Sequence, residues 1–207
     1  MKLLQLLWLV SLVLLSAGCD TKPKLSPLQS ESIILAFGAS LTHGTGASED
    51  KSYPAVLSQR LGLKVINAGV PGEITGQGVV RLPGLLKQYK PDLVLISHGG
   101  NDILRNVDAG TTEQNLRQMI HDVRASGAEV VLIAIPKPSL FASAAPFYET
   151  LSESLEVPVE LDIVTSLQKS PKYKSDTIHF NVEGYALMAE AIETLLEQQG
   201  ALLTLRP

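Results

Sequence analysis

From Ile33 onward, short apolar runs alternate with longer segments of helical periodicity. The apolar runs predict strands at residues 33–37, 64–67, 93–97 and 129–135, with a weaker fifth strand around 157–161. The run Leu93-Val94-Leu95-Ile96 is continuously apolar, which is typical of a parallel strand buried on both faces. Strands that alternate with helices in this way predict repeated βα units and a parallel sheet.

The intervening segments predict helices at residues 53–61, 78–88, 112–126, 146–155 and 182–198. Thr111 or Thr112 is suited to cap the third helix, and Pro91 is expected to close the second. We therefore expect an α/β protein, a three-layer α/β/α sandwich around a flavodoxin-like five-stranded parallel sheet.

The first residues have a different pattern. Lys2 precedes an apolar run at residues 3–15 and small residues at 16–18, the order found in a secretory signal. Cys19, the only cysteine, follows directly, and the segment resembles the lipobox of bacterial lipoproteins. That resemblance implies a lipid on Cys19 and an exported, membrane-anchored protein of the bacterial envelope. Asp20 resembles an inner-membrane retention signal. A plain export signal with a free Cys19 thiol is the alternative.

These patterns divide the chain into four parts. We expect a signal peptide at 1–18, the lipidated cysteine and a tether at 19–32, one domain at 33–200 and a tail at 201–207. A length of 207 residues with 45% hydrophobic residues is enough for one core. The net charge of −4, with both signs interspersed, excludes a nucleic-acid footprint. Oligomeric state stays open.

Polar residues follow the predicted strands where ligands bind in open α/β sheets. Ser40 follows the first strand, Gly69 and Gly72 follow the second, and Asn101 and Asp102 follow the third. Because parallel strands end at one edge of the sheet, we expect these residues to lie near one another.

Near the other terminus, Asp176 and His179 lie three residues apart. A serine hydroxyl needs a base to become a good nucleophile, and a carboxylate can orient that base. Ser40, His179 and Asp176 supply these groups. Candidate oxyanion donors are the backbone N–H groups of Ser40 and Gly72 and the side-chain amide of Asn101.

Each residue also has a purely structural interpretation. Ser40 and Asp176 are residue types that cap helices, and Gly72 and Asn101 are turn formers. His98, beside the Gly99-Gly100-Asn101 segment, is the alternative base. No His, Asp or Glu set has the spacing of a zinc site, and no cofactor is expected.

In order and separation, the four blocks around Ser40, Gly72, Asn101 and Asp176–His179 resemble the SGNH (GDSL) hydrolase superfamily. The likeness is greatest to the acyl-CoA thioesterase, lysophospholipase and arylesterase group. It implies a Ser40, Asp176 and His179 triad and an oxyanion hole of Ser40, Gly72 and Asn101. Where the family motif has Asp before the serine, this chain has Ala39.

The sequence therefore predicts a serine esterase or thioesterase that hydrolyses acyl esters or thioesters, of the arylesterase, lysophospholipase or acyl-CoA thioesterase type, through an acyl-Ser40 intermediate. Two alternatives remain at this point: a carbohydrate O-deacetylase of the cell envelope, and a catalytically weak lipoprotein that binds a ligand in an inherited cleft.

Overall fold

A computed structural model describes residues 25–137 and 143–202. The expected signal peptide, Cys19 and Asp20 lie outside the described residues. In chain order the elements are β1 (Ile33–Gly38), α2 (Ser40–His43), η1 (Glu49–Lys51), α3 (Tyr53–Leu61), β2 (Lys64–Gly69), α4 (Thr75–Tyr89), β3 (Leu93–Ser97), α5 (Gly100–Leu104), α6 (Ala109–Ala125), β4 (Glu129–Ile133), α7 (Pro146–Leu155), β5 (Val159–Glu160), α8 (Ile163–Gln168), η2 (Pro171–Tyr173) and α9 (Val182–Gln198).

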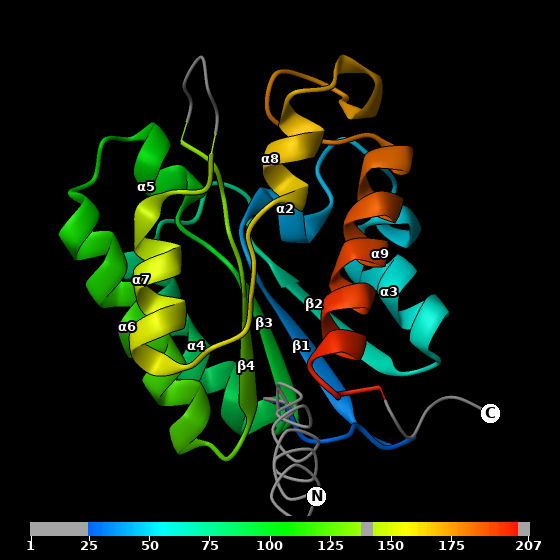
Figure 1. The fold of residues 1–207 in the computed structure, drawn as a ribbon, viewed down its shortest axis with the longest axis vertical. Coiled ribbons are helices and arrows are strands. Elements are labelled where there is room, and N and C mark those ends of the chain that lie inside the picture. Colours follow the sequence, from blue (N-terminus) through cyan, green and yellow to red (C-terminus); the bar gives the residue numbers. More distant parts are fainter. Residues whose placement is uncertain (1–24, 138–142, 203–207) are drawn as a thin grey trace, which may run out of the picture.

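The sheet has the strand order β2-β1-β3-β4-β5, and every pair of neighbours is parallel. Helices α4, α6 and α7 cover one face of the sheet, and α3 and α9 cover the other (Figure 1). The structure confirms the expected three-layer sandwich.

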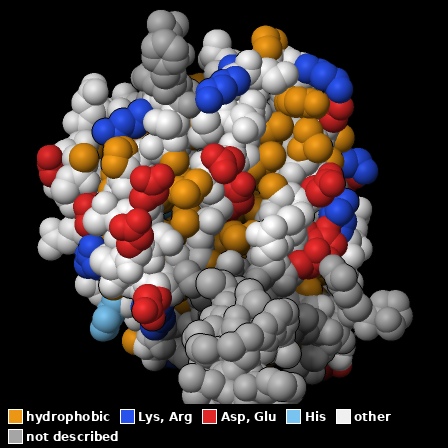
Figure 2. All heavy atoms as spheres, viewed as in Figure 1, with side chains coloured by type: hydrophobic (Ala, Val, Ile, Leu, Met, Phe, Trp, Pro, Cys, Tyr) orange, Lys and Arg blue, Asp and Glu red, His pale blue; other side chains and the backbone are white. Residues whose placement is uncertain are grey.

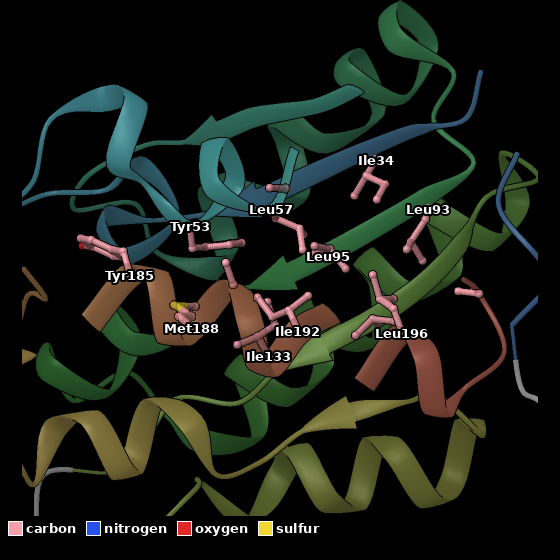
Figure 3. Packing of buried hydrophobic residues seen from close by; sticks show 14 of the residues in the cluster. Ile34, Tyr53, Leu57, Leu93, Leu95, Ile133, Tyr185, Met188, Ile192 and Leu196 are labelled. Carbon is pink, nitrogen blue, oxygen red and sulfur yellow. The ribbon is translucent and has the colours of Figure 1, made fainter. Parts of the chain in front are cut away.

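Side-chain alternation along the strands divides the core into two clusters. Ile34 and Ala36 of β1 face α3 and α9, whereas Leu35 and Phe37 face α4 and α6. Figure 3 shows the first cluster, in which α9 packs against the sheet through an apolar stripe of helical spacing formed by Tyr185, Met188, Ile192 and Leu196. Because both faces are covered, β3 is buried along its whole length.

Local signals set the ends of several helices. Helix α3 has Pro54 in its first turn and ends at Gly62 in the left-handed conformation. At the start of α9, the Asn181 side chain accepts a hydrogen bond from Gly184 N at 3.0 Å.

Two predicted helix starts were wrong. Helix α6 begins earlier than expected, and its cap is Asp108, whose side chain accepts a hydrogen bond from Thr111 N at 2.9 Å. Neither Thr111 nor Thr112 is the capping residue. Helix α4 begins at Thr75 rather than at Gly78. At its start Gln77 Oε1 accepts a hydrogen bond from Ile74 N at 3.2 Å, and the Asp102 carboxylate accepts one from Thr75 N at 2.9 Å. That partner lies 27 residues away in the chain and is invisible to local pattern.

The packed body also begins before Ser32, where we expected a free tether. Leu25 and Leu28 are buried, with 5% and 4% of their surfaces exposed, in the cluster beneath α9. Leu28 N donates to Ala201 O at 2.7 Å, so the segment is fixed to the C-terminal end of the domain. Ala201 is itself buried, which extends the packed body past residue 200.

The strand register brings three strand ends into line. Gly38 pairs with Gly69 of β2 on one side and with Ser97 of β3 on the other. The segments that follow β1, β2 and β3 therefore leave the sheet side by side. In Figure 2 the face in view has acidic and basic side chains interspersed with apolar ones, with no patch of one sign. Within the described residues, no helix is long and apolar enough to cross a membrane.

Candidate active site

Ser40 is the first residue of the short helix α2 and lies just beyond the end of β1. Leu41 and Thr42 behind it are buried, and Gly44 in the left-handed conformation ends the helix. Gly38 permits this sharp turn, because a Cβ there would clash with Ser97 O and Thr42 Oγ1. The turn leaves Ser40 half-buried at the edge of a cleft.

Ala39 is 8% exposed and supplies no side-chain hydrogen bond to the start of α2. An Asp at this position is a residue type that caps a helix through its carboxylate. In this chain the geometry of the turn therefore depends on backbone bonds, among them His43 N to Ala39 O at 2.9 Å.

Asp176 and His179 form one compact turn. The Asp176 carboxylate accepts hydrogen bonds from the backbone N–H groups of Ile178 at 2.7 Å and His179 at 2.8 Å. Its second oxygen lies 2.8 Å from Nδ1 of the His179 ring. The ends of the turn are closed by Ser175 N, which donates to His179 O at 3.0 Å. The three-residue spacing thus assembles the pair locally.

The hydrogen bonds from the His179 backbone and ring and from Ile178 N hold the pKa of Asp176 at about 2. Asp176 is therefore an anion near neutral pH, where it accepts a hydrogen bond from His179 Nδ1–H. That bond leaves Nε2 as the acceptor nitrogen of the neutral ring, the form that a general base needs.

Two contacts join the loop that follows Ser40 to the chain around the Asp176–His179 turn. Tyr185 Oη of α9 donates to Thr45 O at 2.7 Å. Gly46 lies so close to the turn that a Cβ would clash with Ser175 Oγ and approach Phe180 O at 2.7 Å. Thr177 and Ile178, which lie between Asp176 and His179, line the same cleft as Ser40.

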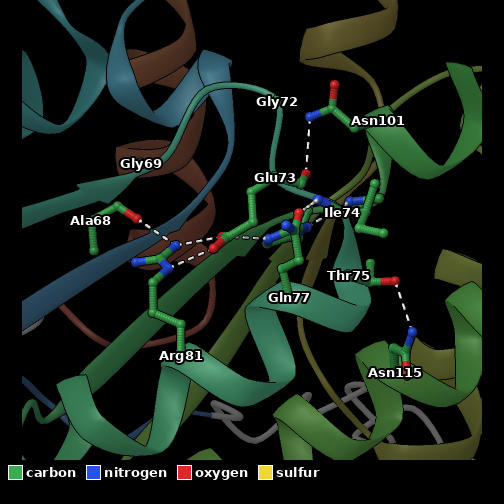
Figure 4. Close-up of polar contacts among 12 residues, drawn as sticks. Ala68, Gly69, Gly72, Glu73, Ile74, Thr75, Gln77, Arg81, Asn101 and Asn115 are labelled. Carbon is green, nitrogen blue, oxygen red and sulfur yellow. Dashed lines mark hydrogen bonds and ion pairs between the residues drawn. The ribbon is translucent and has the colours of Figure 1, made fainter. Parts of the chain in front are cut away.

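Gly72 and Asn101 lie on the loops that follow β2 and β3. Gly72 has φ +79°, a conformation that favours glycine, and its carbonyl accepts from Arg105 Nη2 at 2.9 Å. Asn101 Nδ2 donates to Glu73 O at 3.0 Å. The structure therefore joins these two sequence-predicted residues through Glu73, the neighbour of Gly72 (Figure 4).

His98 is not placed to act as the alternative base. Its side chain is fully buried, and Nε2 lies 2.9 Å from the Glu73 carboxylate. Its Nδ1 accepts a hydrogen bond from Gly99 N at 3.2 Å, so both ring nitrogens are engaged within the protein. The two other histidines, His43 and His121, are exposed.

The cleft has a volume of about 370 Å³, within the usual range for ligand sites. Ser40 and Asn101 both line this cleft. Its apolar lining side chains are Ala39, Leu41, Ile103, Leu104, Ile135, Pro136 and Ile178. Lys137 and Gln168 add polar groups, and Gln168 Nε2 donates to Ile178 O, beside His179. Across residues 25–137 and 143–202, no three His, Cys, Asp or Glu side chains are grouped to hold a metal ion.

Comparison with known proteins identifies the family. The profile of the GDSL-like lipase/acylhydrolase family matches residues 36–187, which is most of the chain. The chain belongs to this family. It is 33% identical over 195 residues to thioesterase 1/protease 1/lysophospholipase L1 of Escherichia coli K12, covering 90% of this chain and 88% of that protein. It is 32% identical over 201 residues to an arylesterase of Vibrio mimicus, covering 92% and 96%. The predicted serine esterase function is thereby confirmed.

Solved structures of GDSL hydrolases have the same fold. The crystal structure of TesA superposes with a TM-score of 0.75 at 26% identity and covers 81% of this chain and 99% of its own. The psychrotrophic esterase EstA from a Pseudoalteromonas species, inhibited by monoethylphosphonate, gives 0.73 at 22% identity, covering 81% and 98%.

Sequence reasoning missed the residues that support the GDSL site. Glu73 and Arg81 were not singled out, because a salt bridge between a loop and a helix leaves no periodic signal. Gly46 was overlooked because its small size matters only against the distant Ser175. One signal was available: Glu73 directly follows a predicted oxyanion donor.

The activity of this GDSL enzyme should fall as the pH is lowered from about 8 to 5, the range in which histidines titrate. A histidine general base must be neutral to accept a proton from a serine, whereas Asp176, with its pKa of about 2, stays ionised throughout. The measurement is kcat/KM against pH with a chromogenic ester. A profile that is flat across this range would rule out His179 as the base.

Proposed function

We propose that Ser40 is the nucleophile, that His179 is the general base and that Asp176 orients and stabilises the imidazole. The observation that supports this most directly is the Asp176–His179 bond of 2.8 Å, in a turn whose intervening residues share a cleft with Ser40. This arrangement supplies each part of a serine hydrolase relay.

In the proposed reaction, His179 Nε2 takes the Ser40 proton while Oγ attacks the acyl carbonyl carbon. The negative charge that develops on the carbonyl oxygen is stabilised by the N–H groups of Ser40, Gly72 and Asn101. Collapse of this intermediate expels the alcohol or thiol, which takes the proton from His179. In deacylation His179 takes a proton from a water molecule as the water attacks acyl-Ser40. The proton then returns to Ser40 Oγ as the acid is released.

The substrate class we propose is an ester or thioester with an apolar acyl chain. An acyl chain seated beside Ser40 can pack against the apolar side chains of Leu41, Ile103 and Ile135. An acetyl group is too small to use that surface, so the cleft favours acyl-chain hydrolysis over the O-deacetylation of a polysaccharide.

Ser40→Ala should abolish covalent labelling by a fluorophosphonate, because it removes the hydroxyl that is proposed to attack the phosphorus. Asn101→Ala should still be labelled but more slowly, with kcat lowered ~100 to 1000-fold through loss of one oxyanion donor. Labelling is followed by gel fluorescence and by mass spectrometry of the modified peptide. Folded wild-type protein that resists labelling would leave only a ligand-binding role.

Lengthening the acyl chain should raise kcat/KM by a factor of about 2 to 4 per methylene until the cleft is full, since burial of each CH₂ contributes about 0.8 kcal/mol. The series of acetyl, butyryl, hexanoyl and octanoyl p-nitrophenyl esters measures this slope. Ile135→Ser is expected to flatten the slope without abolishing the hydrolysis of the acetyl ester. Hydrolysis of the acetyl ester alone would favour the O-deacetylase.

We propose in addition that the enzyme is a lipoprotein of the bacterial envelope, anchored through Cys19. The leader, small residues and lone cysteine support this. Full-length protein expressed in a bacterial host should fractionate with membranes and extract into detergent, while Cys19→Ser should move to the soluble fraction. Equal partitioning of the two proteins would contradict the lipid anchor.

A further inference from the structure

Glu73 is a buried carboxylate next to a candidate oxyanion donor. It directly follows Gly72, and 6% of its side chain is exposed. Both carboxylate oxygens are bonded: Arg81 Nε donates to Oε1 at 2.7 Å, and Arg81 Nη2 and His98 Nε2 approach Oε2 (Figure 4). Glu73 is absent from the lining of the cleft, so its effect on the reaction has to pass through neighbours.

Burial alone raises the pKa of a carboxyl group, but here the hydrogen bonds from His98 and Arg81 and the charge of Arg81 outweigh burial and lower the pKa of Glu73 to about 2. Glu73 is therefore ionised at every pH at which the enzyme works. A carboxylate that is ionised and hydrogen-bonded through both oxygens is held in place by strong, charge-assisted bonds.

The partners of Glu73 fasten it to the ends of β1, β2 and β3. Arg81 Nη2 also donates to Ala68 O of β2 at 3.0 Å, and the guanidinium lies 4.3 Å from the centre of the Phe37 ring of β1. His98 directly follows β3. The Glu73 side chain is thus held by the hydrogen-bonded ends of these strands.

The main chain of Glu73 faces the other candidate donor. Its carbonyl accepts from Asn101 Nδ2 at 3.0 Å. A carbonyl oxygen can only accept, so this bond fixes the amide with its nitrogen, not its oxygen, on the Glu73 side. One N–H of the Asn101 amide is used in this bond, and the second is left for the acyl oxygen of a substrate.

We propose that Glu73 is a positioning residue of the oxyanion hole: its carboxylate fixes the loop to the strand ends, and its backbone then places the Gly72 N–H and the Asn101 amide. The inference rests on the proposed function of those two groups. It gives a role to the hydrogen bond from Asn101 Nδ2 to Glu73 O, in which the proposed triad of Ser40, His179 and Asp176 takes no part. It predicts an effect on kcat rather than on substrate binding.

Glu73→Gln keeps the size of the side chain and removes the charge. The surrounding groups Arg81 Nε–H, Arg81 Nη2–H and His98 Nε2–H are all donors, so the new amide NH₂ must face at least one of them. The loop is expected to shift by a fraction of an ångström. We expect kcat for a p-nitrophenyl ester to fall about 10-fold with KM changed less than about 2-fold, because the misplaced donors act on the transition state.

A double-mutant cycle separates positioning from general damage. If Glu73 acts through the oxyanion donors, the fold-loss in kcat caused by Glu73→Gln should be at least about 3-fold smaller in the Asn101→Ala background than in the wild type. Equal fold-losses in both backgrounds, or a wild-type kcat in Glu73→Gln, would overturn the inference. A normal rate in Asn101→Ala alone would instead refute the proposed oxyanion hole, so the two failures are distinguishable.

The matched control is Glu129→Gln, which removes a carboxylate bonded to Ser26 N at 2.9 Å at the opposite end of the sheet. It should leave kcat unchanged. Circular dichroism and thermal unfolding establish that each variant is folded. If Glu73→Gln does not fold, Arg81→Lys is tested in its place. This variant keeps the positive charge but loses the bidentate hydrogen bonds to Glu73, and it should lower kcat about 3-fold with KM unchanged.

Discussion

The constraint on which the rest of the structure depends is the register of three parallel strands. Gly38 is paired with both Gly69 and Ser97, so β1, β2 and β3 end at one level. Parallel strands buried on both faces have little freedom to slip, because a shift by one residue would move every apolar side chain to the opposite face. The loops bearing Ser40, Gly72 and Asn101 therefore begin from neighbouring fixed points.

The two halves of the candidate site are built in different ways. Asp176 and His179 are assembled by a local turn in which one carboxylate accepts two backbone N–H groups and the imidazole N–H. Gly72 and Asn101 come from different loops, which are joined by long-range hydrogen bonds from Asn101 Nδ2 to Glu73 O and from Arg105 Nη2 to Gly72 O. The base is thus preassembled by local structure, whereas the oxyanion donors depend on the packing of the whole sheet edge.

Chemistry and specificity also come from different parts of the cleft. The proposed relay and oxyanion groups follow β1, β2 and β3 and precede α9, where the backbone is fixed by the sheet and by the helix cap. The apolar lining comes largely from α5 and the segment after β4, including Ile103 and Ile135. Substitutions in that lining can change acyl preference without moving the relay, which is how one fold serves several ester substrates.

Sequence alone predicted the five strands, the five longest helices and the residues of the candidate site, because these depend on local hydrophobic period and on motifs. It did not predict the short helices α2, α5 and α8. Strand β3 and helices α3, α7 and α9 have the predicted bounds. Only the tertiary structure decided the start of α4, which Asp102 caps from 27 residues away, and the burial of Leu25 in what reads as a tether. It alone revealed that His98 is a buried partner of Glu73 rather than a rival base. The physical reason is the same in each case: a polar group is satisfied, or an apolar one is buried, by a partner distant in the chain, and pattern along a sequence contains no record of that partner.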